Sequence, residues 1–185
     1  HWPRIAAIDF GWDHPTALVW CAVDNEDETF YIYDCYRASK ASPTVHAQNI
    51  KMRPHFIPIA YPHDGNRRDS MGNPGLADQY RNLGCNFLLE HFTNPPALGV
   101  NKGSNSIEEG LMAMLQKVEA GKFKVFNTLG DWFEEFRMYH RKDGKVVPLR
   151  DDLMSATRYA FQSQRFAVAG EDPSWTADVT YRNYG

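Results

Sequence analysis

Cysteine is scarce in this chain of 185 residues, which has three, at Cys21, Cys35 and Cys85. Their odd number and wide spacing, without any Cys-x-x-Cys pair, argue against a disulfide framework and against a zinc site. Free thiols of this kind fit a reducing compartment. We find no signal peptide, no lipidation motif and no apolar run of transmembrane length, so we expect a soluble protein without a membrane partner.

The chain also lacks a Gly-x-x-x-x-Gly-Lys-Ser/Thr phosphate loop, so we do not expect it to hydrolyse ATP. It has no internal repeat, and a hydrophobic content of 43% with 14% aromatic residues indicates one packed domain. We place this domain at residues 1–168 and interpret residues 169–185, which show no hydrophobic period, as an irregular tail. The first residue is not methionine, which is what a fragment of a larger protein would show.

The formal net charge of -3 excludes little, because bound cations would offset acidic residues gathered in a metal site. Local basic clusters are more informative, since patches beside acidic residues predict contacts with a phosphate backbone. A solvated charged surface explains some of these residues equally well. The candidate DNA-binding residues are Arg67, Arg68, Lys102, Arg141 and Lys142.

Hydrophobic periodicity predicts a mixed sheet with helices on its faces. Three short runs rich in β-branched and aromatic residues form an expected antiparallel meander, after which strands alternate with helices. The expected strands are 4–10, 16–24, 29–37, 56–61, 86–90 and 122–126. The expected helices are 43–52, 76–83, 107–120, 131–139 and a last one that starts at 151 or 152 and ends near 166.

Aspartates stand at the ends of two apolar runs and at the start of the last helix. Asp9 lies in Ile-Ala-Ala-Ile-Asp-Phe-Gly, Asp64 in Ile-Ala-Tyr-Pro-His-Asp-Gly, and Asp151 and Asp152 open the helix. Each alone has a modest explanation, because aspartate is common in turns and at helix N-termini. Together they predict a site, since converging carboxylates repel one another unless cations such as Mg²⁺ lie between them. Such a site suits metal-assisted phosphoryl chemistry.

The motifs occur in a specific succession: Ile-Asp-Phe-Gly with Thr16-Ala17 soon after, a strand ending in His63-Asp64-Gly65, and Asp151-Asp152-x-x-x-Ala156-x-Arg158-Tyr159-Ala160. This succession resembles the nuclease domain of phage terminase large subunits, from residue 4 to about 166. The resemblance is strongest to headful-packaging phages of the lambdoid podovirus type. It implies an RNase H-like α/β fold and a metal-dependent endonuclease that cuts concatemeric double-stranded DNA at the initiation and termination of packaging.

The resemblance also implies cofactors and partners. Members of the family use two Mg²⁺ or Mn²⁺ ions, about 4 Å apart in such sites, to activate a water and to stabilise the leaving oxygen. An ATPase motor domain precedes the nuclease domain in the same polypeptide, and a terminase small subunit and a portal protein are further partners. The implied location is the host cell cytoplasm, outside the mature virion.

Site residues are carried over by position. Asp9 matches the first-strand aspartate that bridges both metals, and Asp64 matches the second acid. The third acid falls at Asp152 or at Asp151, which stays open. Many relatives carry a further aspartate three residues beyond the Asp152 position, where this chain has Ser155. All four aspartates are therefore candidate catalytic and metal-binding residues.

Other functions are compatible with parts of the sequence. Asp-Phe-Gly after an apolar strand is also found in actin-like ATPases and sugar kinases, but those need a second glycine-rich loop that is absent here. A junction resolvase of the RNase H-like class is an alternative enzyme, expected to prefer branched DNA. A non-catalytic module that docks on the portal is the non-enzymatic alternative, and weak Mn²⁺ binding would distinguish it.

Overall fold

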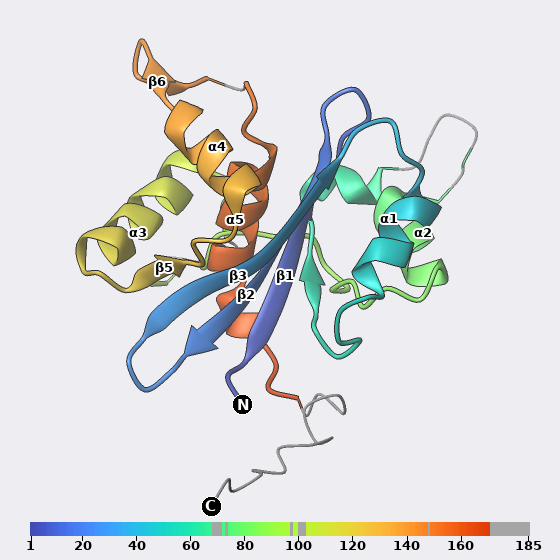
Figure 1. The fold of residues 1–185 in the computed structure, drawn as a ribbon, viewed down its shortest axis with the longest axis horizontal. Coiled ribbons are helices and arrows are strands. Elements are labelled where there is room, and N and C mark those ends of the chain that lie inside the picture. Colours follow the sequence, from blue (N-terminus) through green and yellow to red (C-terminus); the bar gives the residue numbers. More distant parts are fainter. Residues whose placement is uncertain (68–71, 73, 97, 100–102, 148, 171–185) are drawn as a thin grey trace, which may run out of the picture.

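The computed structural model describes residues 1–67, 72, 74–96, 98–99, 103–147 and 149–170. Its centre is a five-stranded sheet in the order β4-β1-β2-β3-β5 (Figure 1). The antiparallel meander is made by β1, β2 and β3, whereas β4 pairs in parallel with β1 and β5 in parallel with β3. The strands are β1 (Arg4–Asp9), β2 (Thr16–Asp24), β3 (Thr29–Ala38), β4 (Ile59–Ala60) and β5 (Phe123–Val125). The predicted α/β class with a mixed sheet is confirmed.

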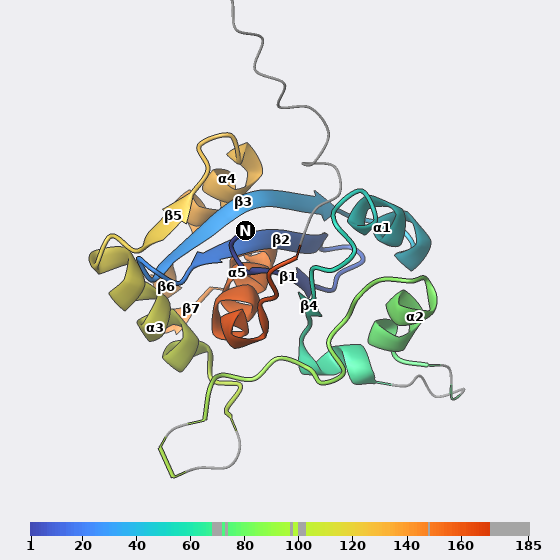
Figure 2. The ribbon, with the colours of Figure 1, turned by 90° about the horizontal axis from the view of Figure 1, so that it is seen from below.

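Helices cover both faces of this sheet. Figure 1 shows α3, α4 and α5 on one side of the strands and α1 and α2 on the other, and in Figure 2 α1 and α2 again lie together, apart from α3 and α5. The helices are α1 (Pro43–Ile50), α2 (Leu76–Asn82), α3 (Ile107–Glu119), α4 (Gly130–Met138) and α5 (Asp152–Gln162), with 3₁₀ turns η1 (His63–Asn66) and η2 (Gln164–Phe166). A hairpin of β6 (Arg141–Lys142) and β7 (Lys145–Val146) precedes α5. No helix in the described ranges has the length and apolar character needed to cross a membrane.

The central strand β1 divides its side chains between two hydrophobic cores. Ile5 and Ala7 pack in the core that contains α5, whereas Ala6 and Ile8 pack in the core beneath α1 and α2. Successive side chains of a strand point to opposite faces. The side chain of Asp9 therefore points to the same face of the sheet as Ile5 and Ala7. This face is covered by α5, at whose start Asp151 and Asp152 lie.

The two short parallel pairings differ from the predicted strands. The expected strand 56–61 is reduced to β4, because Pro58 has no amide hydrogen to donate and interrupts the ladder, although its carbonyl accepts a bond from β1. The expected strand 86–90 is reduced to a single parallel bridge between Ile59 and Phe87. β4 still pairs with β1 at the sheet edge, and Phe87 lies beside β4.

The end of the domain also differs slightly from the prediction. The last helix stops at Gln162 and continues only as η2. Val168 then pairs antiparallel with Arg4, through two backbone hydrogen bonds of 2.9 and 3.0 Å. Of the predicted tail, residues 171–185 lie outside the described part of the chain, so the domain boundary at residue 168 stays a prediction.

Candidate active site

Asp9 ends β1 and shows the strongest electrostatic signature of the site. Its carboxyl keeps partial solvent access but is densely surrounded by protein, and the pKa of Asp9 is raised from 3.8 to about 8, with burial as the largest cause. Three neighbouring carboxylates contribute to this rise, in the order Asp152, Asp64 and Asp151. A hydrogen bond from the Tyr159 hydroxyl opposes the rise. The structure thus brings four acids from three distant segments into one electrostatic neighbourhood.

Asp64 lies in η1, directly after β4, and is exposed. Gly65 explains how this turn reaches the end of β1, because a Cβ at this position would meet the rings of Phe10 and Tyr61 at 2.7 Å. Only glycine allows so close an approach. The turn therefore packs against Phe10, the residue that follows Asp9. The Asp64-Gly65 dipeptide is part of a 3₁₀ turn, not of a β-hairpin, and its glycine allows this close packing.

Asp151 and Asp152 start α5, as N-cap and first helical residue. The Asp151 side chain makes no capping hydrogen bond, so helix capping does not account for it. Asp152 is only 8% exposed. Burial raises the pKa of both carboxyls, Asp151 adds to the rise at Asp152, and His14 opposes the rise at both.

A buried glutamate that sequence reasoning missed holds the start of α5 in place. Glu135 of α4 is fully buried, and its Oε2 accepts a hydrogen bond of 2.7 Å from the backbone N–H of Leu153. Its Oε1 accepts a bond of 3.1 Å from Arg37 of β3. Burial is the main cause that raises the pKa of Glu135. In the sequence Glu134-Glu135 is typical of a solvated helical face, so no local signal identifies it.

Tyr159 was part of the recognised motif, but its contact with Asp9 was not predicted. A signal was available, because Tyr159 lies two helical turns beyond Asp152 and therefore on the same face of α5. Its hydroxyl is thus presented to the same space as the acids.

The carboxylates do not form a closed metal cage in this structure. Among the described residues, no group of three or more histidine, cysteine, aspartate or glutamate side chains is arranged so that it could hold a metal ion. The role of the four aspartates as metal ligands therefore stays a prediction.

The candidate DNA-binding residues have different surroundings. Arg67 is exposed just after η1, and Lys142 is exposed on the β6–β7 hairpin. Arg141 is engaged by Glu108 of α3, with Nη1–Oε1 and Nη2–Oε2 distances of 3.0 and 2.6 Å. Arg68 and Lys102 lie outside the described residues. Contact of these five with DNA stays a prediction.

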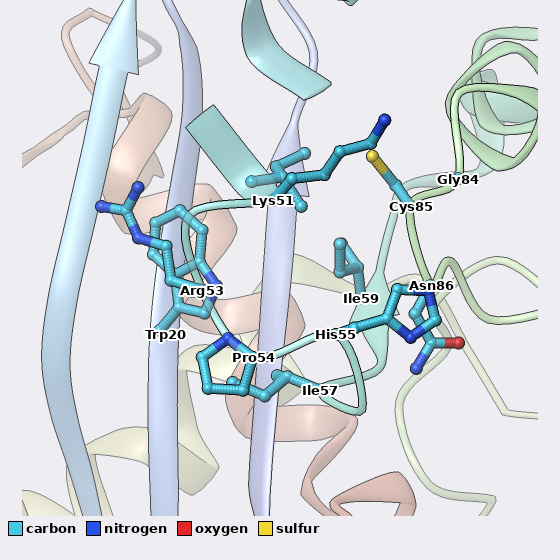
Figure 3. Close-up of a pocket in the computed structure, with 11 residues that line it drawn as sticks. Trp20, Lys51, Arg53, Pro54, His55, Ile57, Ile59, Gly84, Cys85 and Asn86 are labelled. Carbon is cyan, nitrogen blue, oxygen red and sulfur yellow. The ribbon is translucent and has the colours of Figure 1, made fainter. Parts of the chain in front are cut away.

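A cavity of about 230 Å³ follows the end of α1, where Figure 3 shows Lys51 and Cys85 on one side and Arg53 on the other. The Arg53 guanidinium lies 4.2 Å from the ring centroid of Trp20 and donates a 2.8 Å hydrogen bond to Asp34. None of the four candidate acids is among its described lining residues. This cavity is therefore separate from the candidate site.

Comparison with known proteins decides the family. Residues 6–164 match the model of the terminase RNaseH-like domain. The chain belongs to this family. This terminase nuclease domain is 38% identical over 168 residues to the terminase large subunit of Salmonella phage P22, a match that covers 90% of the chain and 32% of the P22 protein. The chain therefore spans about a third of the length of the curated relatives that it matches.

Solved structures agree with this assignment. The P22 large terminase nuclease domain has a TM-score of 0.80 at 37% identity, covering 90% of this chain and 84% of that one. The nuclease domain of the large terminase of bacteriophage SPP1, solved with bound Mn, has a TM-score of 0.56 at 18% identity, covering 86% and 84%. The second likeness shows the fold alone. The predicted RNase H-like nuclease fold of this terminase domain is confirmed.

Proposed function

We propose that this terminase domain is a divalent-metal-dependent endodeoxyribonuclease that cuts concatemeric double-stranded DNA at the initiation and termination of packaging. The observation that carries the proposal is the convergence of four acids, because Asp64, Asp151 and Asp152 each raise the pKa of Asp9. A buried acid whose pKa is raised by neighbouring carboxylates, as that of Asp9 is, is characteristic of functional sites. Membership of the terminase family supports the nucleolytic class.

The chemistry of the donor set fits hard divalent cations. Carboxylate oxygens are preferred ligands of Mg²⁺ and Mn²⁺, and repulsion among the acids is relieved when cations bind. Asp9, Asp64 and Asp152 would hold two such ions, with Asp151 as the alternative third ligand. When bound, the ions supply an activated water and stabilise charge on the leaving 3′-oxygen. The SPP1 relative with bound Mn supports Mn²⁺ as the probe.

The remaining residues keep the acids in position. The Tyr159 hydroxyl hydrogen-bonds Asp9, and Glu135 fixes the first turn of α5, which carries Asp152. Asp9 itself stands on the central sheet, where a strand is more rigid than a loop. The chain thereby limits how far the carboxylates can move apart when no cation is present.

We also propose the partners that membership of the family suggests. They are double-stranded DNA as the substrate, an ATPase motor domain in the same polypeptide, the terminase small subunit and the portal protein. The proposed location is the host cell cytoplasm. Family membership alone supports these assignments.

A cleavage assay tests the function. Wild-type protein should cut linear duplex DNA in Mn²⁺ and not in EDTA, and Asp64→Asn should abolish cutting while the melting temperature stays close to that of the wild type. Asp24→Asn is the matched control, because Asp24 lies at the far end of β2 from Ala17, the partner of Asp9. Full activity of Asp64→Asn would reject the site.

A branched junction and a Mn²⁺ titration separate the alternatives. Faster cutting of the junction than of linear duplex would favour a resolvase. Weak Mn²⁺ binding together with intact DNA would favour the portal-docking module.

A further inference from the structure

A second cavity lies beside the candidate active site. Its volume is about 300 Å³, and its wall includes Asp64 together with Phe10 and Gly11, which directly follow Asp9. Its other walls come from α1, α2 and the start of β2. Asp64 is the one candidate acid among its described lining residues, so a group that enters this cavity would lie beside Asp64.

Trp12 is a large exposed aromatic at this cavity. It is 59% exposed and has no ring contact with another aromatic or cationic side chain in the described part of the chain. The loop that carries it is fixed, because Thr16 Oγ1 accepts a bond of 3.2 Å from Gly11 N and donates one of 2.9 Å to Gly11 O. An exposed aromatic side chain on a hydrogen-bonded loop is a platform on which a planar ligand can stack.

A buried polar atom without a partner belongs to the same wall. His46 is 1% exposed, its Nδ1 lies 3.1 Å from the Tyr36 hydroxyl, and its Nε2 has no hydrogen bond to any residue that the structure describes. Buried polar atoms are nearly always paired. Burial lowers the pKa of His46, and the backbone of Ala41 only partly offsets this, so burial favours the neutral ring, in which Nε2 can make one hydrogen bond.

The charges around the cavity limit what it can hold. Its described lining contains no lysine or arginine, and Asp64 is the one acid there. A phosphate or carboxylate would lie near Asp64 without a balancing cation from this wall, which is unfavourable. A neutral, planar, heteroaromatic group with a polar edge meets all three conditions. It can stack on the ring of Trp12, hydrogen-bond to His46 Nε2 and lie near Asp64 without charge repulsion.

We infer that this cavity receives one nucleobase, displaced from the duplex beside the scissile phosphate, which stacks on Trp12 and hydrogen-bonds to His46 Nε2. The inference rests on the proposed nuclease function and names the part of the substrate that the site recognises. A nucleobase meets the requirements above. It is also joined through its sugar to the backbone that contains the scissile phosphate, which the proposed metal site would bind. Displacing a base costs least where it is already unpaired. Mismatched nucleotides are therefore preferred.

Three duplexes of the same length and otherwise the same sequence test the inference: one fully paired, one with a central mismatch and one with abasic nucleotides in both strands at the mismatch position. The mismatch and the abasic site both weaken pairing, but only the mismatch supplies a base. Cleavage in Mn²⁺ is mapped and timed, and affinity in Ca²⁺ is measured by fluorescence anisotropy. Wild-type protein should favour the mismatch over the abasic duplex by roughly fivefold or more, as expected for stacking of one base on an aromatic ring.

Variants show whether this preference comes from the cavity. Trp12→Ala should make the mismatched and abasic duplexes equal, and Trp12→Phe should keep part of the difference. Phe126→Ala is the matched control, because Phe126 is a half-exposed aromatic beyond β5, at the opposite sheet edge from β4, and should keep the wild-type ratio. His46→Asn keeps a group for Tyr36 but none at Nε2, and should reduce the ratio. Melting temperatures confirm that each variant is folded.

Two results would overturn the inference: equal handling of the mismatched and abasic duplexes by wild-type protein, or a preference that survives Trp12→Ala. Failure of the nuclease function has a different signature, which is no Mn²⁺-dependent cutting of any of the three duplexes. In that case the anisotropy measurements still decide whether a base is bound.

Discussion

Replacing Asp9 by asparagine should make the metal-free protein more stable at neutral pH. Burial, together with the neighbouring carboxylates, raises the pKa of Asp9 from 3.8 to about 8 in the folded protein. Between these two values the unfolded chain carries the ionised carboxylate and the folded chain the protonated acid, so folding loses stability as the pH rises. An amide does not ionise and avoids this loss, and its oxygen can still accept the hydrogen bond from Tyr159.

The size of the effect follows from the pKa shift of Asp9. One pKa unit corresponds to about 1.4 kcal/mol, so the interval between the ordinary value and pH 7 amounts to about 4 kcal/mol at most. Partial solvent access of Asp9 screens the charge and reduces this figure. We expect Asp9→Asn to be more stable than wild type by roughly 2–4 kcal/mol at pH 7 to 8, and by less than about 1 kcal/mol near pH 4.

Urea denaturation in EDTA across this pH range measures the difference, with Asp24→Asn as a control that should follow the wild type. Added Mn²⁺ should then stabilise the wild type and stabilise Asp9→Asn much less, because a ligand to the ion has been removed. The reasoning is refuted if Asp9→Asn is less stable than wild type in EDTA at pH 8, or if its advantage does not change with pH.

Substitutions at three further residues test the supporting contacts. Glu135→Ala should lower the free energy of unfolding, measured by urea denaturation, by about 3 kcal/mol, because it leaves Arg37 and the backbone N–H of Leu153 without their partner. Glu135→Gln should lower it by less, and equal losses in the two variants would contradict the argument. Gly65→Ala should cost roughly 1–3 kcal/mol through overlap with aromatic rings and should slow Mn²⁺-dependent cleavage, so unchanged activity would count against the packing argument. Tyr159→Phe removes a hydrogen bond that lowers the pKa of Asp9, so the pH midpoint of cleavage should move upward; a downward shift would disprove the contact.

Elements with strong local signals could be predicted from the sequence. The meander was recognisable from β-branched runs and turn residues, and β2 has the bounds expected. Helix α3 follows the sequence Ser106-Ile107-Glu108-Glu109, a capping-box pattern that predicts a helix start, and the Ser106 hydroxyl accepts the bond from Glu109 N at 3.3 Å. The Asp143-Gly144 turn has positive φ at both residues, 52° and 75°, as a two-residue hairpin requires.

The short edge strands were less predictable, because the length of their hydrogen-bond ladder depends on which backbone N–H and C=O groups can pair with the neighbouring strand. The run 56–61 is apolar enough for a long buried strand, but Pro58 limits the ladder to β4. Apolar character alone does not show where such a ladder ends.

The candidate site was predictable where the chemistry is local and not where it is tertiary. Asp9, Asp64 and Asp152 stand at strand ends and at a helix start, which are visible in the sequence. Glu135 acts through Arg37, 98 residues away in the chain, so its burial could not be inferred locally. The unpaired ring nitrogen of His46 is likewise visible only once α1 has packed on the sheet.

A crystal of this chain soaked in Mn²⁺ and measured at the manganese absorption edge tests the central claim most directly. The account predicts two anomalous peaks among the carboxylates of Asp9, Asp64 and Asp152 or Asp151. Peaks at other residues only, or none at saturating Mn²⁺ with these side chains ordered, would contradict it.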